Sequence, residues 1–469
     1  MISNIEQGKR KEKLEPGLGK IRNYNEVVEY LDGLKAADYS EASLRRMKEL
    51  DSQFQGIASK VDTIVVGGTN GKSLSMHFAA KLLKEEGFKV GTLYSTHLLN
   101  YTERMVLDVE QVNNKSFADV VNEVINVAAA HAIKATAHEI LIMAALKHFV
   151  DQKCDVVMLE ANYGGKLDAV AYFNPKIAAV TRVADDARGL LGTDLDAMAF
   201  ELSEIAKAGT WFISAEQSKL RLQKMKTWCE DRNIKWAMPI RKLATLPYIY
   251  EQLYGRVASL GERIAQIYVE DIKGKFSPFL RGNLLATQKG QRGRPTLEAK
   301  RNAELNPLKT LKTFWADQFD LLHGRFELLD KENPSMLLDN SSNLDAFSNL
   351  FLGIRLVHYQ KPLKGLALVL GLSKACDATE TLKLIRYLLK KVNGQLFFVP
   401  LNGDEASHDV NELNTMAKEL NFKAKACTSL TEALAMAKAA VDERDGLVVV
   451  AGSTSLVSEF WKLRGIKKF

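Results

Sequence analysis

The sequence has few features of a membrane-spanning, exported or disulfide-stabilised protein. No uninterrupted apolar run approaches the roughly 18 residues that a transmembrane helix needs. Residues 1–20 carry charges throughout and lack an apolar segment of signal-peptide length. Four cysteines occur among 469 residues, far apart and without a C-x-x-C pair, which is typical of reduced structural thiols. We therefore expect a cytoplasmic protein with no membrane partner.

Signals for nucleic-acid binding are also weak. The formal charge of +7, from 64 basic and 57 acidic residues, is modest for this length. Two basic runs, at residues 9–13 and 289–301, contain no aromatic side chain that could stack on bases. We interpret them as a solvated tail and a solvated loop, and expect no nucleic-acid partner. The length allows two or three domains with sizeable cores.

Residues 63–73 are the most informative stretch of the chain. Four β-branched residues at 63–66 predict a buried strand, and a helical pattern starts near Lys72. A strand that turns through glycines into a helix offers backbone N–H groups and a positive dipole end to a phosphate. Lys72 would add a point charge, and the Ser73 hydroxyl could bind Mg²⁺. Because Val66 stands where the strict phosphate-loop pattern has glycine, an ordinary glycine-rich turn is the alternative. The residues expected to hold the nucleotide are Gly68, Thr69, Asn70, Gly71, Lys72 and Ser73.

Strands and helices alternate around this loop. The patterns predict helices at 24–34, 40–50, 117–131 and 138–150, and further strands at 89–94, 154–159 and 177–183. Such alternation predicts a P-loop-type, doubly wound, mostly parallel α/β sheet, whose ligands lie beyond the carboxyl ends of the strands. Ser73, Ser95, Glu160 and the residues after Val183 all follow strands, so we expect them at that edge.

A second, smaller Rossmann-like α/β domain is expected after a hinge at residues 318–324. Between residues 211 and 305 the pattern loosens, with a predicted strand at 263–270 and a helix at 308–319. Beyond the hinge we expect strands at 336–338, 365–370, 396–400 and 446–450, and helices at 344–357, 379–392, 411–420 and 430–442. The predicted organisation is a tail at 1–20, an ATP-binding domain at 21–318 and a C-terminal domain at 325–469.

Five short segments resemble motifs of one protein family, and they occur in that family's order. They are Gly68-Thr69-Asn70-Gly71-Lys72, Ser95-Thr96-His97-Leu98 with Glu103-Arg104 after it, the segment from Glu160 to Asp168, His323-Gly324-Arg325, and Asp339 with Asn343. Together they resemble the folylpolyglutamate synthase and dihydrofolate synthase branch of the Mur ligase superfamily. The resemblance implies an ATP-dependent amide ligase that adds glutamate to a folate or dihydropteroate carboxylate through an acyl phosphate. It implies ATP and Mg²⁺ as cofactors, small-molecule substrates and a monomer.

The resemblance also implies roles for individual residues. An ionised Glu160 at the end of an apolar strand is costly unless it meets a cation, and Mg²⁺ fits, with Ser95 as a further ligand. The alternative is a glutamate paired with a lysine or arginine. Arg325 corresponds to an arginine that contacts phosphate, and Asp339 to a carboxylate that binds the nucleotide ribose, with Asn343 in the same motif. For Asp339, turn formation after a strand is the alternative.

The chain departs from the family at the second metal and the amine substrate. Ala187 replaces a metal-binding histidine, so Asp186 is the expected substitute ligand beside Ser73, Ser95 and Glu160, with Asp185 as the alternative. Lys207 corresponds to a lysine whose carbamylation would supply a further carboxylate; a surface lysine is the alternative. Lys72, Glu160, Lys207 and Arg325 form the expected catalytic set.

Further departures affect substrate identity. Ser342 replaces a histidine associated with the amine, and Gly282-Asn283-Leu284 stands in the region of a lost Gly-x-His-Gln motif. His97 could contact a substrate, and Glu139 could be a capping or buried residue as readily as a catalytic one. Two alternatives therefore stay open: a related ligase with another acid and amine, or a degenerate paralogue that binds nucleotide without ligation.

Overall fold

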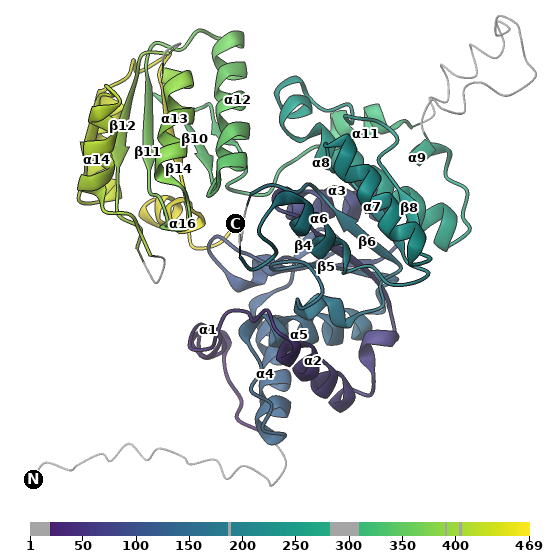
Figure 1. Cartoon of the computed structure of the whole chain (residues 1–469). Helices are drawn as coiled ribbons and strands as arrows, with labels where there is room; N and C mark the ends of the chain where they lie inside the picture. Colours follow the sequence, from purple (N-terminus) through teal and green to yellow (C-terminus); the bar gives the residue numbers. More distant parts are fainter. Residues whose placement is uncertain (1–18, 186–188, 282–308, 390–391, 403–405) are drawn as a thin grey trace, which may run out of the picture.

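The computed structural model describes residues 19–185, 189–281, 309–389, 392–402 and 406–469. Most of the predicted tail, Asp186, Gly282-Asn283-Leu284 and the basic run at 289–301 lie outside these residues. Within them the chain forms two sheets, each between layers of helices, and the two sheets follow one another along the sequence (Figure 1). No helix among the described residues is both long enough and apolar enough to span a membrane.

The first sheet has eight strands in the described part of the chain, in the order β4-β3-β2-β5-β1-β6-β7-β8. All neighbouring pairs from β2 to β8 are parallel, whereas β3 and β4 add an antiparallel edge. The strands are β1 (Asp62–Gly67), β2 (Val90–Leu93), β3 (Met105–Leu107), β4 (Glu110–Gln111), β5 (Val156–Glu160), β6 (Ile177–Val180), β7 (Trp211–Ser214) and β8 (Lys235–Ala237).

Both faces of this sheet are covered, because successive side chains of its central strands point in opposite directions. Ile64 and Val66 of β1 pack with α3 and α8, whereas Val65 packs with the helices of the other face. The first face carries α3 (Lys72–Glu85), α8 (Tyr248–Ile267) and α11 (Leu311–Gln318). The second carries α1 (Tyr24–Asp32), α2 (Glu41–Gln53), α4 (Asn114–Ala130), α5 (Ala137–Asp151), α6 (Leu195–Ser203) and α7 (Lys219–Asp231).

The predicted strand at 263–270 is wrong. These residues continue α8 and then form a short π-helix at Tyr268–Ile272. The apolar run from Ile264 to Val269 is buried, and a short buried run does not distinguish a strand from a helix. What holds α8 is close packing on α3: a Cβ at Gly261 would lie 3.0 Å from the backbone nitrogen of Ala79. The region from 211 also contains the short strands β7 and β8, which the loosened pattern did not predict.

The second sheet has six strands in the described residues, in the order β13-β12-β11-β14-β10-β9. Only β9 is antiparallel to its neighbour. The strands are β9 (Glu327–Leu329), β10 (Ser335–Asp339), β11 (Leu366–Leu370), β12 (Gly394–Phe398), β13 (Ala424–Ala426) and β14 (Leu447–Ala451). One face carries α12 (Leu344–Gln360), α13 (Ala378–Leu389) and α14 (Val410–Glu419); the other carries α15 (Leu430–Ala439) and α16 (Thr454–Leu463). The predicted class, a doubly wound, mostly parallel α/β fold with a smaller second α/β unit, is confirmed.

The connection between the sheets runs from α11 to β9, where the hinge was predicted. Its beginning is bound to α3: the Nζ of Lys81 donates to the carbonyl of Gln318 at 2.6 Å, and the Nε2 of His77 lies 2.5 Å from a carboxylate oxygen of Asp320. Helices α8 and α12 also pack together across the gap between the sheets. The exact domain boundaries and any hinge motion stay predictions.

Candidate functional site

The turn between β1 and α3 leaves the first turn of α3 open to a ligand. Gly68 and Gly71 have φ values of +113° and +86°, which L side chains rarely adopt. Gly71 is the N-cap residue of α3, so no side-chain oxygen caps the helix. The N–H groups of its first turn therefore face the space that the positive end of the helix dipole favours for an anion. This arrangement is what the sequence predicted for residues 68–73.

Gly68 is required by contact as well as by backbone angle. A Cβ there would lie 2.2 Å from the Oγ1 of Thr181 and 2.8 Å from its backbone nitrogen. We expect Gly68→Ala to lower the free energy of unfolding by about 3 kcal/mol, since strain and overpacking add. Gly87→Ala is the matched control, because Gly87 has a φ of +85° with nothing within 4 Å of a Cβ. Its expected cost is about 1 kcal/mol. Urea unfolding of both variants measures the difference, and equal costs would contradict the contact argument.

The loop is anchored to the segment that follows β6. The backbone N–H of Thr69 donates to the carbonyl of Arg182 at 2.9 Å, and the backbone N–H of Ala184 donates to the Thr69 hydroxyl at 3.0 Å. The Nζ of Lys72 donates to the carbonyl of Gly68 at 3.0 Å, so the lysine lies over the loop. The segment that follows β6 therefore holds the loop that follows β1 in place.

Glu160 meets the loop at the carboxyl edge of the sheet. Val66 of β1 and Glu160 of β5 are register partners, which places the end of β5 beside the turn. The Ser73 hydroxyl lies 3.2 Å from one Glu160 oxygen, and the backbone N–H of Ser95 donates to the other at 3.2 Å. Glu160 is 3% exposed, and its charge raises the pKa of the buried Arg104, which burial lowers. The structure thus brings Ser73, Ser95 and Glu160 together, as predicted.

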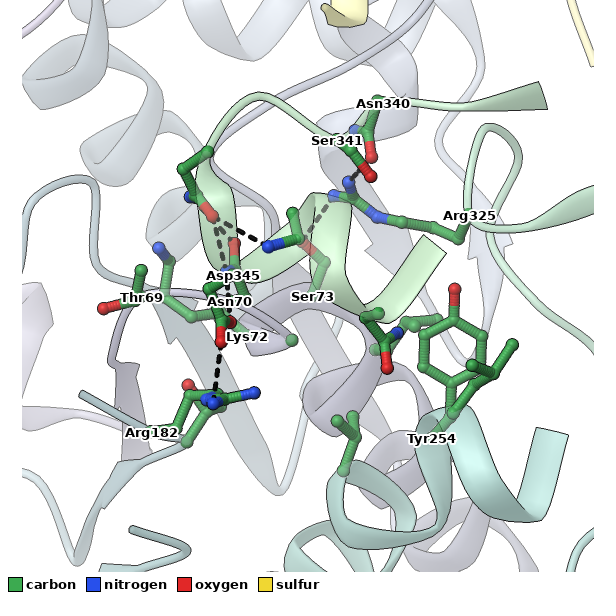
Figure 2. Close-up of a pocket in the computed structure, with 18 of the residues that line it drawn as sticks. Thr69, Asn70, Lys72, Ser73, Arg182, Tyr254, Arg325, Asn340, Ser341 and Asp345 are labelled. Carbon is green, nitrogen blue, oxygen red and sulfur yellow. Dashed lines mark hydrogen bonds and ion pairs between the residues drawn. The ribbon is translucent and has the colours of Figure 1, made fainter. Parts of the chain in front are cut away.

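The second sheet supplies the opposite wall. The Nη2 of Arg325 lies 3.5 Å from the Ser73 hydroxyl, and its Nη1 bonds to Asn340 (Figure 2). Arg325 therefore reaches the phosphate loop from the far side of the hinge segment. Asn343 caps α12 and donates to the side-chain oxygen of Asn70 at 3.2 Å.

Asp339 ends β10 and is buried. Its oxygens accept from the backbone N–H groups of Phe326 at 2.8 Å and Ser341 at 2.9 Å. Burial raises the pKa of this carboxyl, and these hydrogen bonds oppose the rise. The geometry matches the alternative of turn formation, although Asp339 also lines the cavity described next.

These residues enclose a cavity of about 580 Å³ between the two sheets. Volumes of this size suit a nucleotide-sized ligand. Its wall includes side chains that the sequence patterns did not identify: Arg182, Gln252, Tyr254, Arg256, Asp345 and Asn349. Three of them lie on α8, in the region predicted to be irregular. Small residues at helical spacing in 255–261 were the signal for this closely packed helix.

The structure does not place Lys207 among the residues that line this cavity, contrary to its expected position beside the metal. Its Nζ donates to the carbonyl of Tyr172 at 3.3 Å, and Thr210 nearby bonds to the carbonyl of Pro175. These residues precede β6 and β7, so they lie at the amino edge of a parallel sheet whose carboxyl edge holds the loop. Burial lowers the pKa of Lys207. Asp186, the other residue expected at a second metal, lies outside the described residues.

Glu139 has a structural role. It is fully buried, completes a capping box with Thr136 at the start of α5, and binds Arg46 through both oxygens at 2.7 Å. We expect Glu139→Gln to lower the free energy of unfolding by about 3 kcal/mol, because the guanidinium of Arg46 loses the buried negative charge with which it pairs. Nucleotide affinity should not change.

The matched control is Glu123→Gln on the neighbouring helix α4. Glu123 is half exposed and lies 3.8 Å from Lys147, so its expected cost is at most about 0.5 kcal/mol. Urea unfolding measures the stabilities, and titration with a non-hydrolysable ATP analogue measures the affinities. A loss of affinity in Glu139→Gln without a loss of stability would favour a catalytic role.

A second cavity of about 150 Å³ adjoins the first and shares Ser73 and Arg325 with it. His97 lines it, and burial together with the charge of Arg104 lowers the pKa of His97 to about 3. Its imidazole is therefore neutral near pH 7. Tyr94 is buried in the same wall, and its hydroxyl has no hydrogen-bond partner among the described residues. Charged residues, among them Glu103 and Arg325, line the same cavity.

Comparison with known proteins finds relatives that carry the same name. No family model matches the sequence. A dihydrofolate synthase/folylpolyglutamate synthase of Bacillus subtilis is 24% identical over 328 residues, which cover 66% of this chain and 70% of that protein. A protein of the same name from Buchnera aphidicola is 28% identical over 193 residues, 41% of this chain and 45% of that protein. The chain is therefore similar in sequence to proteins named dihydrofolate synthase/folylpolyglutamate synthase.

Solved structures of the family share the fold over nearly the whole chain. The Mycobacterium tuberculosis folylpolyglutamate synthase complexed with ADP matches with a TM-score of 0.73 at 18% identity, covering 94% of this chain and 98% of that chain. The bifunctional enzyme of Yersinia pestis complexed with AMPPNP and a Mn ion matches with a TM-score of 0.69 at 20% identity, covering 95% and 98%. The sequence alignment with the Buchnera protein spans less than half of that protein's length, whereas these structural matches span both sheets.

Proposed function

We propose that the protein is an ATP-dependent ligase that joins glutamate to the carboxylate of a folate or dihydropteroate. It would act as a cytoplasmic monomer on small molecules, without nucleic-acid or membrane partners. A carboxylate oxygen of the acid attacks the γ-phosphorus of ATP, the bond to the β-phosphate oxygen breaks, and an acyl phosphate and ADP form. The glutamate nitrogen then attacks the acyl carbon, the bond to phosphate breaks, and an amide, phosphate and a proton result.

One observation carries this proposal: Glu160, Ser73 and Arg325 converge from β5, α3 and the second sheet on one point of the cavity. Phosphoryl transfer needs mostly positioning and charge stabilisation. The N–H groups of residues 71–73 and the ammonium of Lys72 would hold the phosphates. The fork of Arg325 would stabilise the charge that develops on the transferred group. The similar structures that were solved with ADP, and with AMPPNP and a Mn ion, support a nucleotide as the ligand.

The described donors fit a magnesium ion that is shared with the nucleotide. Mg²⁺ takes oxygen ligands and usually binds one or two carboxylates together with substrate phosphates and water. Glu160 and Ser73 provide such oxygens 3.2 Å apart, and the described residues contain no group of three or more acidic, histidine or cysteine side chains that could hold a metal ion without the nucleotide. When bound, the ion would neutralise charge on the phosphate oxygens.

The second cavity is the proposed place of the reacting amine. It opens on Ser73 and Arg325, where the acyl phosphate would form, and its neutral His97 can accept a hydrogen bond from the amine. Glutamate would thus approach from the side of the second sheet.

The experiment is a phosphate-release assay on the purified protein. ATP, Mg²⁺, glutamate and dihydropteroate or a reduced folate should release phosphate only when both acid and amine are present. Each substrate is omitted in turn as a control, and mass spectrometry should find the glutamyl product. Release with another acid or amine would identify a ligase of different specificity.

The second candidate function is nucleotide binding without ligation. Lys207 does not line the cavity, so it is not placed to supply a metal ligand there, and Ser342 stands where the family has histidine. A nucleotide-binding protein that releases no phosphate with any acid and amine would favour this candidate over the ligase.

A further inference from the structure

Asp345, in the first turn of α12, connects the second sheet to the phosphate loop. One of its oxygens accepts from the side-chain nitrogen of Asn70 at 2.7 Å. The same nitrogen lies 3.0 Å from the side-chain oxygen of Asn343, which caps α12. The side-chain amide of Asn70 therefore forms hydrogen bonds with residues at the start of α12 and not with its own loop (Figure 2).

The other oxygen of Asp345 pairs with Arg182, whose Nη2 lies 2.7 Å away. Arg182 follows β6, and its carbonyl accepts the N–H of Thr69. One carboxylate of the second sheet thus binds both segments that shape the loop in the first sheet. Its side chain is 16% exposed and that of Arg182 is 37% exposed, so solvent screens the ion pair only in part.

We propose that Asp345 is a positioning residue that holds the two sheets closed over the nucleotide cavity. The proposal rests on the proposed function, because closure matters for the reach of Arg325. The Nη2 of Arg325 lies 3.5 Å from the Ser73 hydroxyl, at the limit of a hydrogen bond, so a small opening would withdraw it. Asp345, in α12, and Arg325, just before β9, belong to the same α/β unit and contact the same loop, so the Asp345 contacts would help to hold that distance.

This role predicts a specific kinetic signature. Asp345→Ala should lower the fraction of nucleotide-free protein that is closed. The apparent affinity for nucleotide then falls in proportion to the closed fraction, and saturating nucleotide restores closure. We expect the KM for ATP to rise about tenfold while kcat changes less than about twofold. A merely structural role would instead lower the active fraction, which reduces kcat and leaves KM unchanged.

The conservative variant separates the two contacts. Asp345→Asn keeps an oxygen for the amide of Asn70 and loses the charge that pairs with Arg182, so it should raise KM about threefold. Arg182→Gln should do the same, and the double variant should add little to either single one, because both remove one interaction. Asp196→Ala is the control: its ion pair with Lys224, at 2.5 Å, joins α6 to α7 within the first sheet. That variant should keep the wild-type KM.

Fluorescence energy transfer tests closure without catalysis. Labels at Leu220→Cys on α7 and Tyr387→Cys on α13 report the distance between the sheets, since both positions are exposed and the four native cysteines are buried. The nucleotide-free Asp345→Ala protein should show a longer or broader distance distribution than wild type, and AMPPNP with Mg²⁺ should restore it.

The outcomes separate the two proposals. A wild-type distance distribution in nucleotide-free Asp345→Ala, with an unchanged AMPPNP midpoint, would overturn the role of Asp345. Failure of the protein to bind AMPPNP or to release phosphate would overturn the proposed function, and the nucleotide-free distances would still decide the role of Asp345.

Discussion

Lys72→Ala is expected to reduce ATP-dependent phosphate release by about a hundredfold or more, the usual effect of losing one preorganised charge at a transferring group. The lysine begins α3 and its ammonium donates to the Gly68 carbonyl, so it lies over the turn where the phosphates are proposed to bind. Nucleotide affinity should fall as well, because the outer phosphates lose their point charge. Phosphate release and calorimetric titration with AMPPNP measure the two effects.

Lys84→Ala is the matched control for this prediction. Lys84 is an exposed lysine in the last turn of the same helix, bonded to the carbonyl of Asp108. It tests whether loss of any lysine from α3 harms the enzyme. Wild-type activity and affinity in Lys72→Ala would refute the assignment of the loop, whereas equal losses in both variants would point to damage of the helix.

The second large effect is expected from Glu160→Gln. The amide keeps the shape and can still accept from Ser95, but it loses the charge that a hard cation requires. The Mg²⁺ concentration for half-maximal activity should rise at least roughly tenfold, as for perturbed metal sites in general. Removal of Mg²⁺ with EDTA should stop turnover of the wild type. Nucleotide affinity measured without metal should stay the same in both proteins.

Glu110→Gln provides the comparison, because Glu110 is an exposed glutamate on the edge strand β4 of the same sheet. Its Mg²⁺ dependence should match the wild type. An unchanged Mg²⁺ dependence in Glu160→Gln would show that Glu160 does not bind the ion, even though it lies beside Ser73.

The nucleotide loop and its acid could be predicted from the sequence because each is a local pattern. A strand end, two glycines and a helix start dictate the turn at 68–71, and an acid at the end of an apolar run is conspicuous wherever it occurs. Parallel pairing then brings strand ends to one edge, which is why Glu160 meets Ser73 although they are 87 positions apart in the sequence. The family resemblance added Arg325 from the second sheet.

Other parts could not be predicted, because they depend on where elements pack. Lys207 lies in a short motif that resembles the family's, yet it lies at the amino edge of the sheet. No local sequence pattern indicates at which edge of a sheet a residue lies. The sequence did not predict the cavity wall formed by α8, because the apolar pattern at the end of this helix fits a buried strand equally well. Asp345 and Arg182 are unremarkable charged residues in the sequence, and they meet only because α12 begins above the loop.

By itself the sequence determined the α/β class, the order of most strands and helices, and the phosphate loop, since these follow from hydrophobic periodicity and backbone preferences within a few residues. Only the tertiary structure decided how the second sheet covers the loop, which residues cross between the sheets, and which matching motif lies away from the site. Those features depend on contacts between residues far apart in the chain, and the free energy of such contacts is set by packing and burial that no short segment contains.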